Sequence, residues 1–516
     1  MIKKKEEILT IKDKVEPQLP LNWLLTTIGE VGIISSGGTP STKNLRYWEG
    51  DISWITPADL SKYTKKFISK GSRCITKDGL EESSAKLLPK GTVLFSSRAP
   101  IGYTVIANND LATNQGFKNL ITTESLLSEY VYYYFKTLKP LAETVSSGTT
   151  FLELSASKFA KLPFPLAPLV EQTKIVTKIE ELFINLEYTE NDLQDTLKKL
   201  EMYRYSLLNE IFNQKSKTRK IIKLKDLGTI LTGGTPSKNK PEFYGSEYNF
   251  YKPSDLTAYG KIYESKDKLS HLGYNSIRHV PKDSILVSCI GTIGKIGLIK
   301  EEGAFNQQIN AIVPDDKYLP EFIFYQAISL NFQNLLKDST SATTISIINK
   351  SKFSQLDFVY YNIEEQKTMV QEIDYKFSII DNLKLTIESS LEKIKLTRAK
   401  ILDDAFKGKL IPQIEGVDNA KVLLKKIQKE KSEYLEQQRH LEKNKVKKRK
   451  FMDNKLSILE ILEKENGLLL INDLWQQSIF KDDIEKFYSE LKRIEQNIII
   501  ENNNKNSFIR IKNENK

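Results

Sequence analysis

The strongest constraint on this 516-residue chain is that its first four hundred residues hold an internal repeat. Short blocks recur in the same order at offsets of 192 to 196 residues. Short insertions between matched blocks are what variation in surface loops produces. The chain therefore holds two copies of one unit of roughly 190 residues. The recurring blocks are Gly37-Gly38-Thr39-Pro40-Ser41 with 233–237, Asn114-Gln115 with Asn306-Gln307, and Glu171-Gln172 with Glu365-Gln366.

Each copy has two parts with different hydrophobic periods. The first part mixes short β-branched runs, Gly and Pro punctuation and one helical stretch, which predicts an α+β domain. The second part has neither Gly nor Pro in its body and keeps apolar residues at a 3-4 spacing, which predicts a long helix. The expected boundaries are an N-terminal segment 1–20, domain 1 at 21–168, spacer helix 1 at 169–220, domain 2 at 221–362, spacer helix 2 at 363–412, a basic helical linker at 413–455 and a C-terminal domain at 456–516.

The two long helices carry matched apolar seams that predict a coiled coil. About 40 helical residues make a rod of roughly 60 Å. An antiparallel pair would place the two domains at opposite ends, related by an approximate twofold axis. That pairing would bring Glu190 opposite Arg398, which is favourable, and Arg204 opposite Lys384, which is not, so charge leaves the orientation open. The seam residues are Ile179, Phe183, Leu186, Leu193, Leu197 and Leu200 in the first helix, and Ile373, Phe377, Ile380, Ile387, Leu391 and Ile394 in the second.

Composition excludes several classes of protein. Two cysteines and three histidines provide no zinc-ligand spacing and no disulfide framework, so we expect no metal and a reducing compartment. The sequence holds no apolar stretch of about 18 residues, which predicts a cytoplasmic protein that does not contact a membrane. Lys and Arg number 77 against 66 Asp and Glu, and residues 421–450 alone carry a net charge of +8. Net charge therefore gives little information on whether the first four hundred residues bind a polyanion.

The region after the repeat predicts a further small domain. Three helical patterns at 456–465, 471–477 and 482–494 precede a hairpin pattern ending at Phe508–Ile511. That order resembles a winged helix, a fold that binds DNA and proteins alike. The preceding segment ends in Lys445-Val-Lys-Lys-Arg-Lys450, which fits either phosphate contact or a solvated charged helix.

The ordered set of motifs resembles the DNA-specificity subunit of Type I restriction-modification systems. The motifs are the Gly-Gly-Thr-Pro-Ser turns, the Glu-Gln pairs that open each long helix, and the helix ends at Phe212 and Phe406. The resemblance covers residues 20 to 412. It implies two target recognition domains that read the halves of an asymmetric bipartite site in double-stranded DNA, and helices that set the gap.

The same resemblance implies that the chemistry belongs to partners. Two methyltransferase subunits would use S-adenosylmethionine, and restriction subunits would use ATP and Mg. This chain would then be non-catalytic and bind no cofactor. Gly291–Gly297 lacks the spacing of a phosphate-binding loop, and no Asn-Pro-Pro-aromatic segment is present. The rival hypotheses are a single-chain nuclease or methyltransferase, and a scaffold or decoy subunit that binds partner proteins without sequence preference.

Candidate DNA contacts come from loops that hold hydroxyl, amide or basic groups. Motifs identical in both domains cannot distinguish two targets, so a structural turn is the favoured interpretation for the Gly-Gly-Thr-Pro-Ser and Asn-Gln blocks. Arg98 differs from its counterpart Ile290 and is the better candidate. The pairs Thr149-Thr150 and Thr343-Thr344 could either contact phosphates or cap the segment that follows each of them. The full candidate set is Thr39, Ser41, Ser97, Arg98, Asn114, Thr149, Thr150, Thr235, Ser237, Lys252, Thr292, Lys295, Asn306, Thr343 and Thr344.

Overall fold

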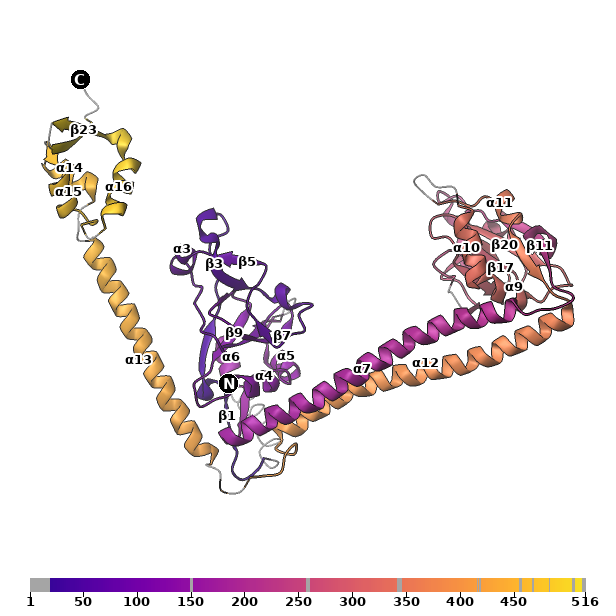
Figure 1. Cartoon of the computed structure of the whole chain (residues 1–516), viewed down its shortest axis with the longest axis horizontal. Coiled ribbons are helices and arrows are strands. Elements are labelled where there is room, and N and C mark those ends of the chain that lie inside the picture. Colours follow the sequence, from indigo (N-terminus) through magenta and orange to yellow (C-terminus); the bar gives the residue numbers. More distant parts are fainter. Residues whose placement is uncertain are drawn as a thin grey trace. The chain divides into compact units, whose positions relative to one another are not determined.

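The computed structural model (Figure 1) resolves the chain into two compact units, Met1–Glu181 with Ala399–Lys516, and Leu182–Arg398. Each unit is described separately below. Among the described residues, no helix is both long and apolar enough to cross a membrane. The residues that the structure describes are 19–148, 152–256, 260–340, 346–414, 416, 419–453, 457–465, 468–481, 483–503 and 506–512. Most of the expected N-terminal segment 1–20 therefore lies outside them.

Domain 1 is built on a five-stranded sheet in the order β2-β9-β6-β7-β4, flanked by a three-stranded sheet in the order β5-β3-β8. A separate pair, β1 with β10, joins the start and the end of the domain. The strands are β1 (Leu24–Thr27), β2 (Ile33–Ser36), β3 (Trp48–Ile55), β4 (Phe67–Ile68), β5 (Arg73–Ile75), β6 (Val93–Ser97), β7 (Ile101–Ala107), β8 (Ala112–Thr113), β9 (Phe117–Ile121) and β10 (Pro163–Leu166). The helices are α2 (Ile28–Val31), α3 (Lys77–Glu81), α4 (Ser128–Phe135), α5 (Lys139–Val145) and α6 (Ala156–Ala160).

Domain 2 repeats this plan. Its main sheet has the order β12-β20-β17-β18-β14, which matches domain 1 strand for strand, and β15-β13-β19-β16 forms its second sheet. The strands are β11 (Lys220–Lys223), β12 (Gly228–Thr232), β13 (Tyr244–Tyr251), β14 (Lys261–Ile262), β15 (Asp267–Leu269), β16 (His279–Val280), β17 (Ile285–Ser288), β18 (Ile296–Ile299), β19 (Gly303–Phe305), β20 (Ile309–Pro314) and β21 (Asp357–Tyr360). The helices are α8 (His271–Asn275), α9 (Pro320–Ala327), α10 (Leu330–Asp338) and α11 (Lys350–Ser354). The predicted α+β repeat is confirmed.

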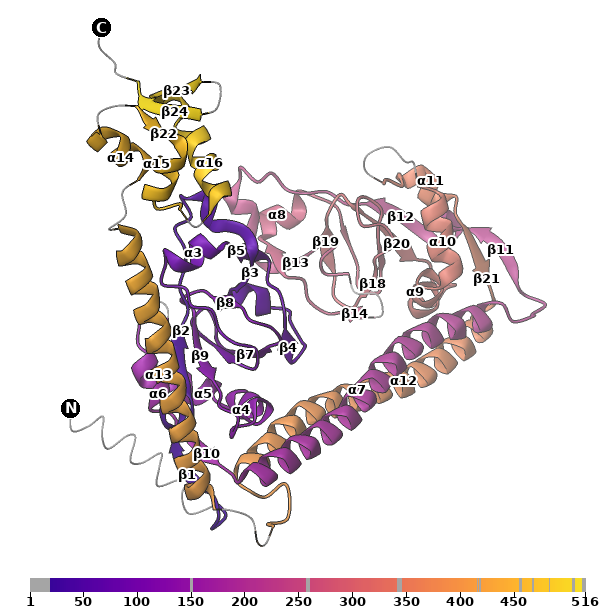
Figure 2. The same cartoon turned by 60° about the vertical axis from the view of Figure 1, so that its left-hand side comes forward.

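Two helices of 44 residues each, α7 (Leu169–Phe212) and α12 (Ile363–Phe406), run side by side (Figure 2). They are antiparallel, because Glu190 pairs with Arg398 at 2.7 Å while Glu201, further along α7, pairs with Lys384, earlier in α12. All twelve predicted seam residues are buried or partly buried. The expected favourable pair of Glu190 and Arg398 is confirmed.

The expected clash between Arg204 and Lys384 is wrong. The Arg204 guanidinium is buried, pairs with Asp381 and lies 4.7 Å from the centre of the Phe377 ring. Lys384 pairs instead with Glu201. Arg204 and Lys384 each reach about one turn along the partner helix to an acidic residue, so the two cations do not face each other.

The Glu-Gln motifs join each domain to its helix. In the first copy, Glu171 accepts hydrogen bonds from the side chains of Asn22 and Trp23, the latter at 2.6 Å. Gln172 accepts from the backbone N–H of Leu127 and donates to the carbonyl of Ala167. In the second copy, Glu365 accepts from Ser216 and Thr218, and Gln366 bonds the backbone of Leu319 and Tyr361.

The far end of each helix is fixed by aromatic packing. Phe406, at the end of α12, meets the rings of Tyr130 and Tyr134 in domain 1 with centroids 5.2 and 5.1 Å away. Phe212, at the end of α7, lies 5.6 Å from the Phe322 ring in domain 2. Each domain is thereby attached both to the start of one long helix and to the end of the other.

The C-terminal region begins with α13 (Ala420–Asp453), a helix of 34 residues. A small domain follows, with its own core of nine buried apolar residues that includes Leu474, Phe487 and Ile509. Its elements are α14 (Ile458–Glu465), β22 (Leu469–Leu470), α15 (Ile471–Gln477), α16 (Ile484–Arg493), β23 (Ile498–Asn503) and β24 (Asn506–Ile511). The predicted three helices and final hairpin are present, and the short strand β22 between the first two helices, which pairs with β24, was not predicted.

Candidate nucleic-acid interface

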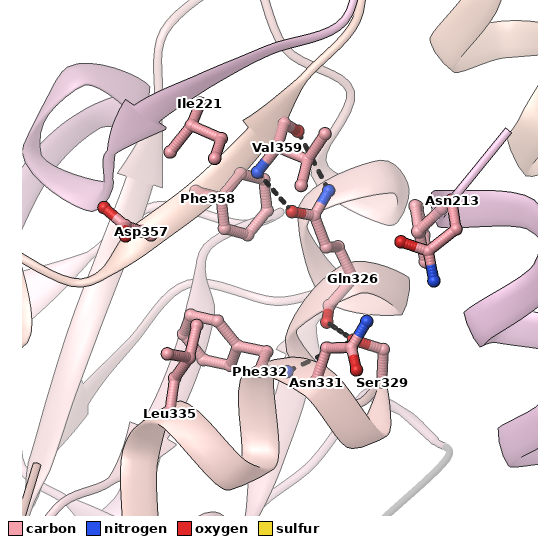
Figure 3. A pocket seen from close by; sticks show the side chains of 11 residues that line it. Asn213, Ile221, Gln326, Ser329, Asn331, Phe332, Leu335, Asp357, Phe358 and Val359 are labelled. Carbon is pink, nitrogen blue, oxygen red and sulfur yellow. Dashed lines mark hydrogen bonds between the residues drawn. The ribbon is translucent and has the colours of Figure 1, made fainter. Parts of the chain in front are cut away.

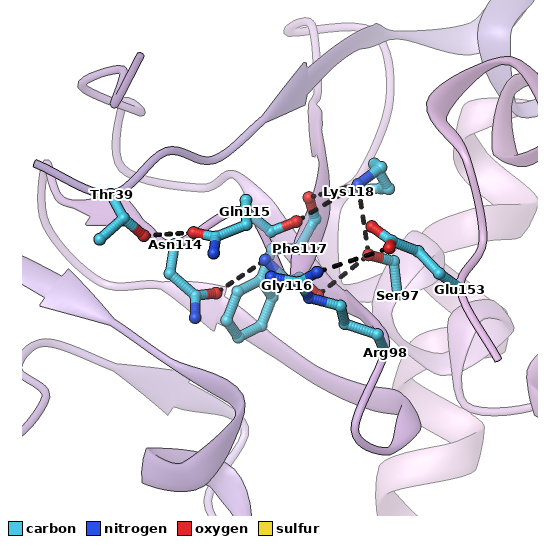
Figure 4. Close-up of polar contacts among 9 residues, drawn as sticks. All are labelled: Thr39, Ser97, Arg98, Asn114, Gln115, Gly116, Phe117, Lys118 and Glu153. Atoms are coloured by element: carbon cyan, nitrogen blue, oxygen red, sulfur yellow. Dashed lines mark hydrogen bonds and ion pairs between the residues drawn. The ribbon is translucent and has the colours of Figure 1, made fainter. Parts of the chain in front are cut away.

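The Gly-Gly-Thr-Pro-Ser turns form part of the shared scaffold. Thr39 donates its hydroxyl to the side-chain oxygen of Gln115 (Figure 4). In the second copy, Thr235 donates in the same way to Gln307. A Cβ on Gly37 would lie only 2.0 Å from the carbonyl oxygen of Asn114, so the two segments touch through backbone. The hydroxyls of Thr39 and Thr235 are thus engaged within the protein. Ser41 and Ser237, one residue past each turn's Pro, are exposed.

The Asn-Gln loops have the same structural character. Asn114 accepts a hydrogen bond from the backbone N–H of Gly116 at 2.9 Å, and Asn306 accepts one from Gln308 at 2.8 Å. Asn306 also donates to the Thr235 hydroxyl at 3.0 Å. Because these amide groups shape their own loops in both domains, they match the structural alternative rather than the reading of adenine.

The two domains differ sharply where β6 turns into β7. Arg98 follows the last residue of β6, and its guanidinium lies 3.4 Å from the carboxylate of Glu153 (Figure 4). Both side chains are more than one-third exposed. An exposed pair of this kind contributes little to stability, so its partners can exchange contacts at low cost. Arg98 is therefore an accessible cation at the rim of domain 1.

A buried cation lies beneath this pair. Lys118, in β9, is 6% exposed, and its ammonium donates to the Ser97 hydroxyl at 3.3 Å and to two backbone carbonyls at 3.4 Å. Burial lowers the pKa of Lys118, and the neighbouring Glu153 partly restores it. Sequence reasoning missed Lys118, although an isolated Lys in the run Phe117–Ile121 is the signal that could have found it.

Ser97 was expected among the DNA contacts, and its burial corrects that expectation. It is fully buried, and its hydroxyl donates to the carbonyl of Gly116 at 3.0 Å while accepting from Lys118. Its role is to tie β6 to the loop before β9 and to solvate the buried ammonium.

Domain 2 replaces this charged cluster with neutral groups. At the positions of Arg98 and Glu153 stand Ile290 and Ile347, whose backbones pair in an isolated bridge. Cys289 stands at the position of Ser97, and burial raises the pKa of its thiol to about 12. Asn310 stands at the position of Lys118 and accepts a hydrogen bond from the Thr232 hydroxyl at 2.7 Å. The same place on the same scaffold thus carries charge in domain 1 and apolar surface in domain 2.

The remaining candidates in domain 2 have mixed surroundings. Lys252 forms an ion pair with Asp267 at 2.8 Å, and Lys295 donates to the carbonyl of Pro253 at 3.3 Å. Thr292 is exposed in the turn between β17 and β18. Thr149, Thr150, Thr343 and Thr344 lie outside the described residues.

A second difference between the domains lies around α3 and α8. In domain 1 a hollow of about 450 Å³ is lined by residues that include Ile52, Leu80 and Leu87. In domain 2 the equivalent positions hold Tyr248, Tyr274 and His279, whose rings stack with successive centroids 4.3 Å apart. The stacked rings fill this space in domain 2, whereas the aliphatic side chains of domain 1 leave it open.

A hollow of about 240 Å³ in domain 2 lies at the junction with α7 instead (Figure 3). Gln326 stands here at the position of Tyr134 in domain 1, and its amide exchanges two hydrogen bonds with the backbone of Val359. The smaller side chain accounts for the space, so this hollow is a packing difference. Among the described residues no group of three or more His, Cys, Asp or Glu side chains could hold a metal ion.

The chain is similar to several Type I restriction enzyme specificity subunits. It is 36% identical over 272 residues to the MjaIX Type I restriction enzyme specificity subunit of Methanocaldococcus jannaschii, an alignment that covers 49% of this chain and 62% of that one. It is 23% identical to the EcoBI specificity subunit of Escherichia coli over 74% of this chain and 93% of that one. The alignment thus spans less than two-thirds of the length of the MjaIX subunit.

The fold is also that of a solved chain from a study of complex assembly and conformational transition in a type I restriction-modification system. The TM-score is 0.61 at 18% identity, and the match covers 76% of this chain and 99% of that one. The family described as Type I restriction modification DNA specificity domain matches residues 20–199 and 216–393, one match per repeat. The chain therefore belongs to the family of Type I restriction-modification DNA specificity proteins.

Proposed function

We propose that this chain is the DNA-reading subunit of a Type I restriction-modification complex, with one target recognition domain for each half of an asymmetric bipartite site. The observation that carries the proposal is the contrast at one loop of a repeated scaffold. Arg98, Glu153 and Lys118 in domain 1 stand where domain 2 has Ile290, Ile347 and Asn310. Two readers that share a fold but present different chemistry recognise different sequences.

Arg98 has the chemistry of a base-reading residue. A guanidinium can donate two parallel hydrogen bonds to the O6 and N7 of guanine in the major groove. In the free protein it is held by Glu153 in a half-exposed pair, so exchange of that partner for a base costs little. Ile290 and Ile347 can make only apolar contacts, such as with the methyl group of thymine.

The paired helices α7 and α12 support a spacing role. Each domain is joined to one helix start by the Glu-Gln motif and to the other helix end by a Phe, so the spacer is continuous with both readers. Two half-sites on one face of a duplex are separated by about one helical turn, roughly 34 Å. The length of the helices would then set the gap.

We further propose that the chemistry lies in partner subunits. Methyltransferase subunits would bind S-adenosylmethionine and restriction subunits would bind ATP and Mg, while this chain selects the site in the cytoplasm. No residue of this chain is assigned a catalytic role. The competing function is a scaffold or decoy that assembles with the same partners without preference for sequence.

Selection from a random duplex library tests the proposal. The purified chain, assembled with its methyltransferase partner, is incubated with the library, and the retained duplexes are sequenced. We expect enrichment of two different short blocks separated by a fixed gap. Retention of the partner without any enriched sequence would support the decoy and contradict the proposal.

A further inference from the structure

Three charged side chains of domain 1 converge on Ser97. The Lys118 ammonium donates to the Ser97 hydroxyl at 3.3 Å, and Arg98 is the next residue along the chain. Glu153 is brought to the same place by its neighbour Leu154, whose backbone N–H donates to the carbonyl of Ser97 at 3.0 Å. The cluster therefore places two cations around one carboxylate, and Figure 4 shows that carboxylate pointing toward Ser97.

Backbone hydrogen bonds hold Glu153 beside the end of β6. Ser147 and Glu153 exchange two such bonds, at 3.1 and 2.9 Å, and the bond from Leu154 to Ser97 joins the same segment to the strand. The position of Glu153 therefore does not depend on its ion pair with Arg98. The Arg98 side chain can leave the pair while Glu153 stays in place.

The two cations differ in their freedom to move. The Arg98 side chain is 36% exposed, and its contact with Glu153 at 3.4 Å is longer than the roughly 2.7–2.9 Å of a strong charge-assisted hydrogen bond. Lys118 is buried, and two backbone carbonyls as well as Ser97 accept hydrogen bonds from its ammonium. Burial lowers the pKa of Lys118, Glu153 acts against this shift, and Arg98 adds to it. Departure of Arg98 therefore removes a repulsion from the buried ammonium.

We propose that Lys118 is a positioning residue for the half-site that domain 1 reads: its buried ammonium becomes the counter-charge of Glu153 when Arg98 leaves that carboxylate for the DNA. After this exchange Glu153 and Lys118 balance each other. Without Lys118, release of Arg98 would leave an unpaired carboxylate beside the phosphates of the duplex, which repel it. The inference rests on the proposed DNA-reading function, because it concerns how Arg98 becomes available to the duplex.

Domain 2 has neither the ion pair nor the buried cation at this place. Ile290 and Ile347 are neutral, and Asn310, at the position of Lys118, accepts the hydroxyl of Thr232. A buried ammonium destabilises a fold unless it is paired and hydrogen-bonded. Its presence only in the copy that carries an exposed Arg–Glu pair supports a role tied to that pair. The effect of Lys118 should accordingly be confined to one half-site.

Affinity for the duplex enriched by library selection tests this inference. The full-length chain with its methyltransferase partner is compared with Lys118→Met, which removes the charge and keeps an unbranched side chain. We expect Lys118→Met to weaken binding by about three- to tenfold and to leave base preference in the half-site of domain 2 unchanged. Lys136→Met is the charge-matched control in domain 1. It removes a cation that lies 5.2 Å from the centre of the Tyr132 ring, and it should bind as the unaltered chain does.

Glu153→Gln separates charge balance from loop shape. Added to Lys118→Met, it leaves no carboxylate without a partner, so the double variant should regain the affinity of the unaltered chain within about twofold. A lysine that only shapes its loop through carbonyl contacts would give no such rescue. Glu153→Gln alone should bind at least as tightly as the unaltered chain, because Arg98 then leaves no charge behind. This single variant tests the inference even if Lys118→Met fails to fold, since weaker binding would overturn it.

The outcomes distinguish this inference from the proposed function. Unchanged affinity in Lys118→Met, or a loss that Glu153→Gln does not restore, would overturn the inference alone while the unaltered chain still selects its sequence. An equal loss in Lys136→Met would also overturn it, because the effect would then follow net charge. Absence of any enriched sequence with the unaltered chain would contradict the proposed function, and the inference with it.

Discussion

The carboxylate of Glu190 lies 2.7 Å from the guanidinium of Arg398, and this ion pair joins the two antiparallel long helices. Both side chains are about one-quarter to one-third exposed. In a double-mutant cycle with Glu190→Ala and Arg398→Ala, we expect a coupling free energy of about 0.2–1 kcal/mol, typical of a partly solvated pair. Urea unfolding measures it. A repulsive coupling free energy would contradict the favourable contact between these two side chains in this alignment.

The repeated turn predicts unequal effects of the same substitution in the two domains. A Cβ at Gly38 would lie 2.3 Å from the backbone nitrogen of Ala85, whereas at Gly234 the nearest atom is a side-chain carbon of Ile277 at 3.4 Å. We expect Gly38→Ala to destabilise domain 1 by about 1–3 kcal/mol and Gly234→Ala to have an effect within about 0.5 kcal/mol. Equal melting temperatures for the two variants would refute this account of the turns.

Replacement of Arg98 tests the reading of one half-site. Arg98→Ala should relax the base preference in one block of the recognition sequence by about 1–3 kcal/mol per lost bidentate contact and leave the other block unchanged. The matched control is Arg278→Ala in domain 2, where the guanidinium donates to the carbonyl of Thr232 at 3.0 Å. Library selection with each variant provides the measurement. Unchanged preference in both blocks would remove Arg98 from the interface.

The two cysteines should differ in reactivity. Cys289 is buried with a pKa raised to about 12, whereas Cys74 is partly exposed. One thiol of the native chain should therefore react with an aromatic disulfide reagent at pH 8 and release one equivalent of aromatic thiolate from the reagent, whereas the unfolded chain should release two. Two equivalents from the native chain would contradict the packing around β17.

Cys289 should also make stability depend on pH. Its folded pKa of about 12 lies above the ordinary value of 9.0, so between these values the unfolded chain loses a proton that the folded chain keeps. The stability of domain 2 should fall as pH rises through this window. Cys289→Ser, which introduces the residue that domain 1 has at Ser97, should remove that contribution when urea unfolding is repeated at pH 9 and 11.

The repeat and the hydrophobic periods were sufficient to predict the α+β domains, the long helices and their seam, because these features depend on pattern alone. The contacts of Arg204 and the anchoring of α13 were not predictable in this way. Arg204 pairs with Asp381 through the reach of its side chain, and Glu430 meets Ser125 across 305 positions of sequence. Such contacts depend on tertiary geometry.

The candidate interface was only partly visible in the sequence for the same reason. Comparison of the copies singled out Arg98, because it differs from Ile290, and set Asn114 and Asn306 apart as recurring groups. The burial of Ser97 and the place of Lys118 beneath Arg98 and Glu153 follow from how β6 and β9 pair, since Ser96 lies opposite Phe117 in that ladder. The pattern of residues along the sequence does not show which of these side chains are buried.

The most direct test of the central claim is base-resolved mapping of adenine methylation in cells that express this chain with its methyltransferase partner, compared with cells that lack only this chain. We predict a methylated motif of two unlike blocks separated by a fixed gap, which disappears when the chain is absent. Methylation that persists without the chain, or that shows no split motif while both proteins are present, would contradict the account of two different readers on one spacer.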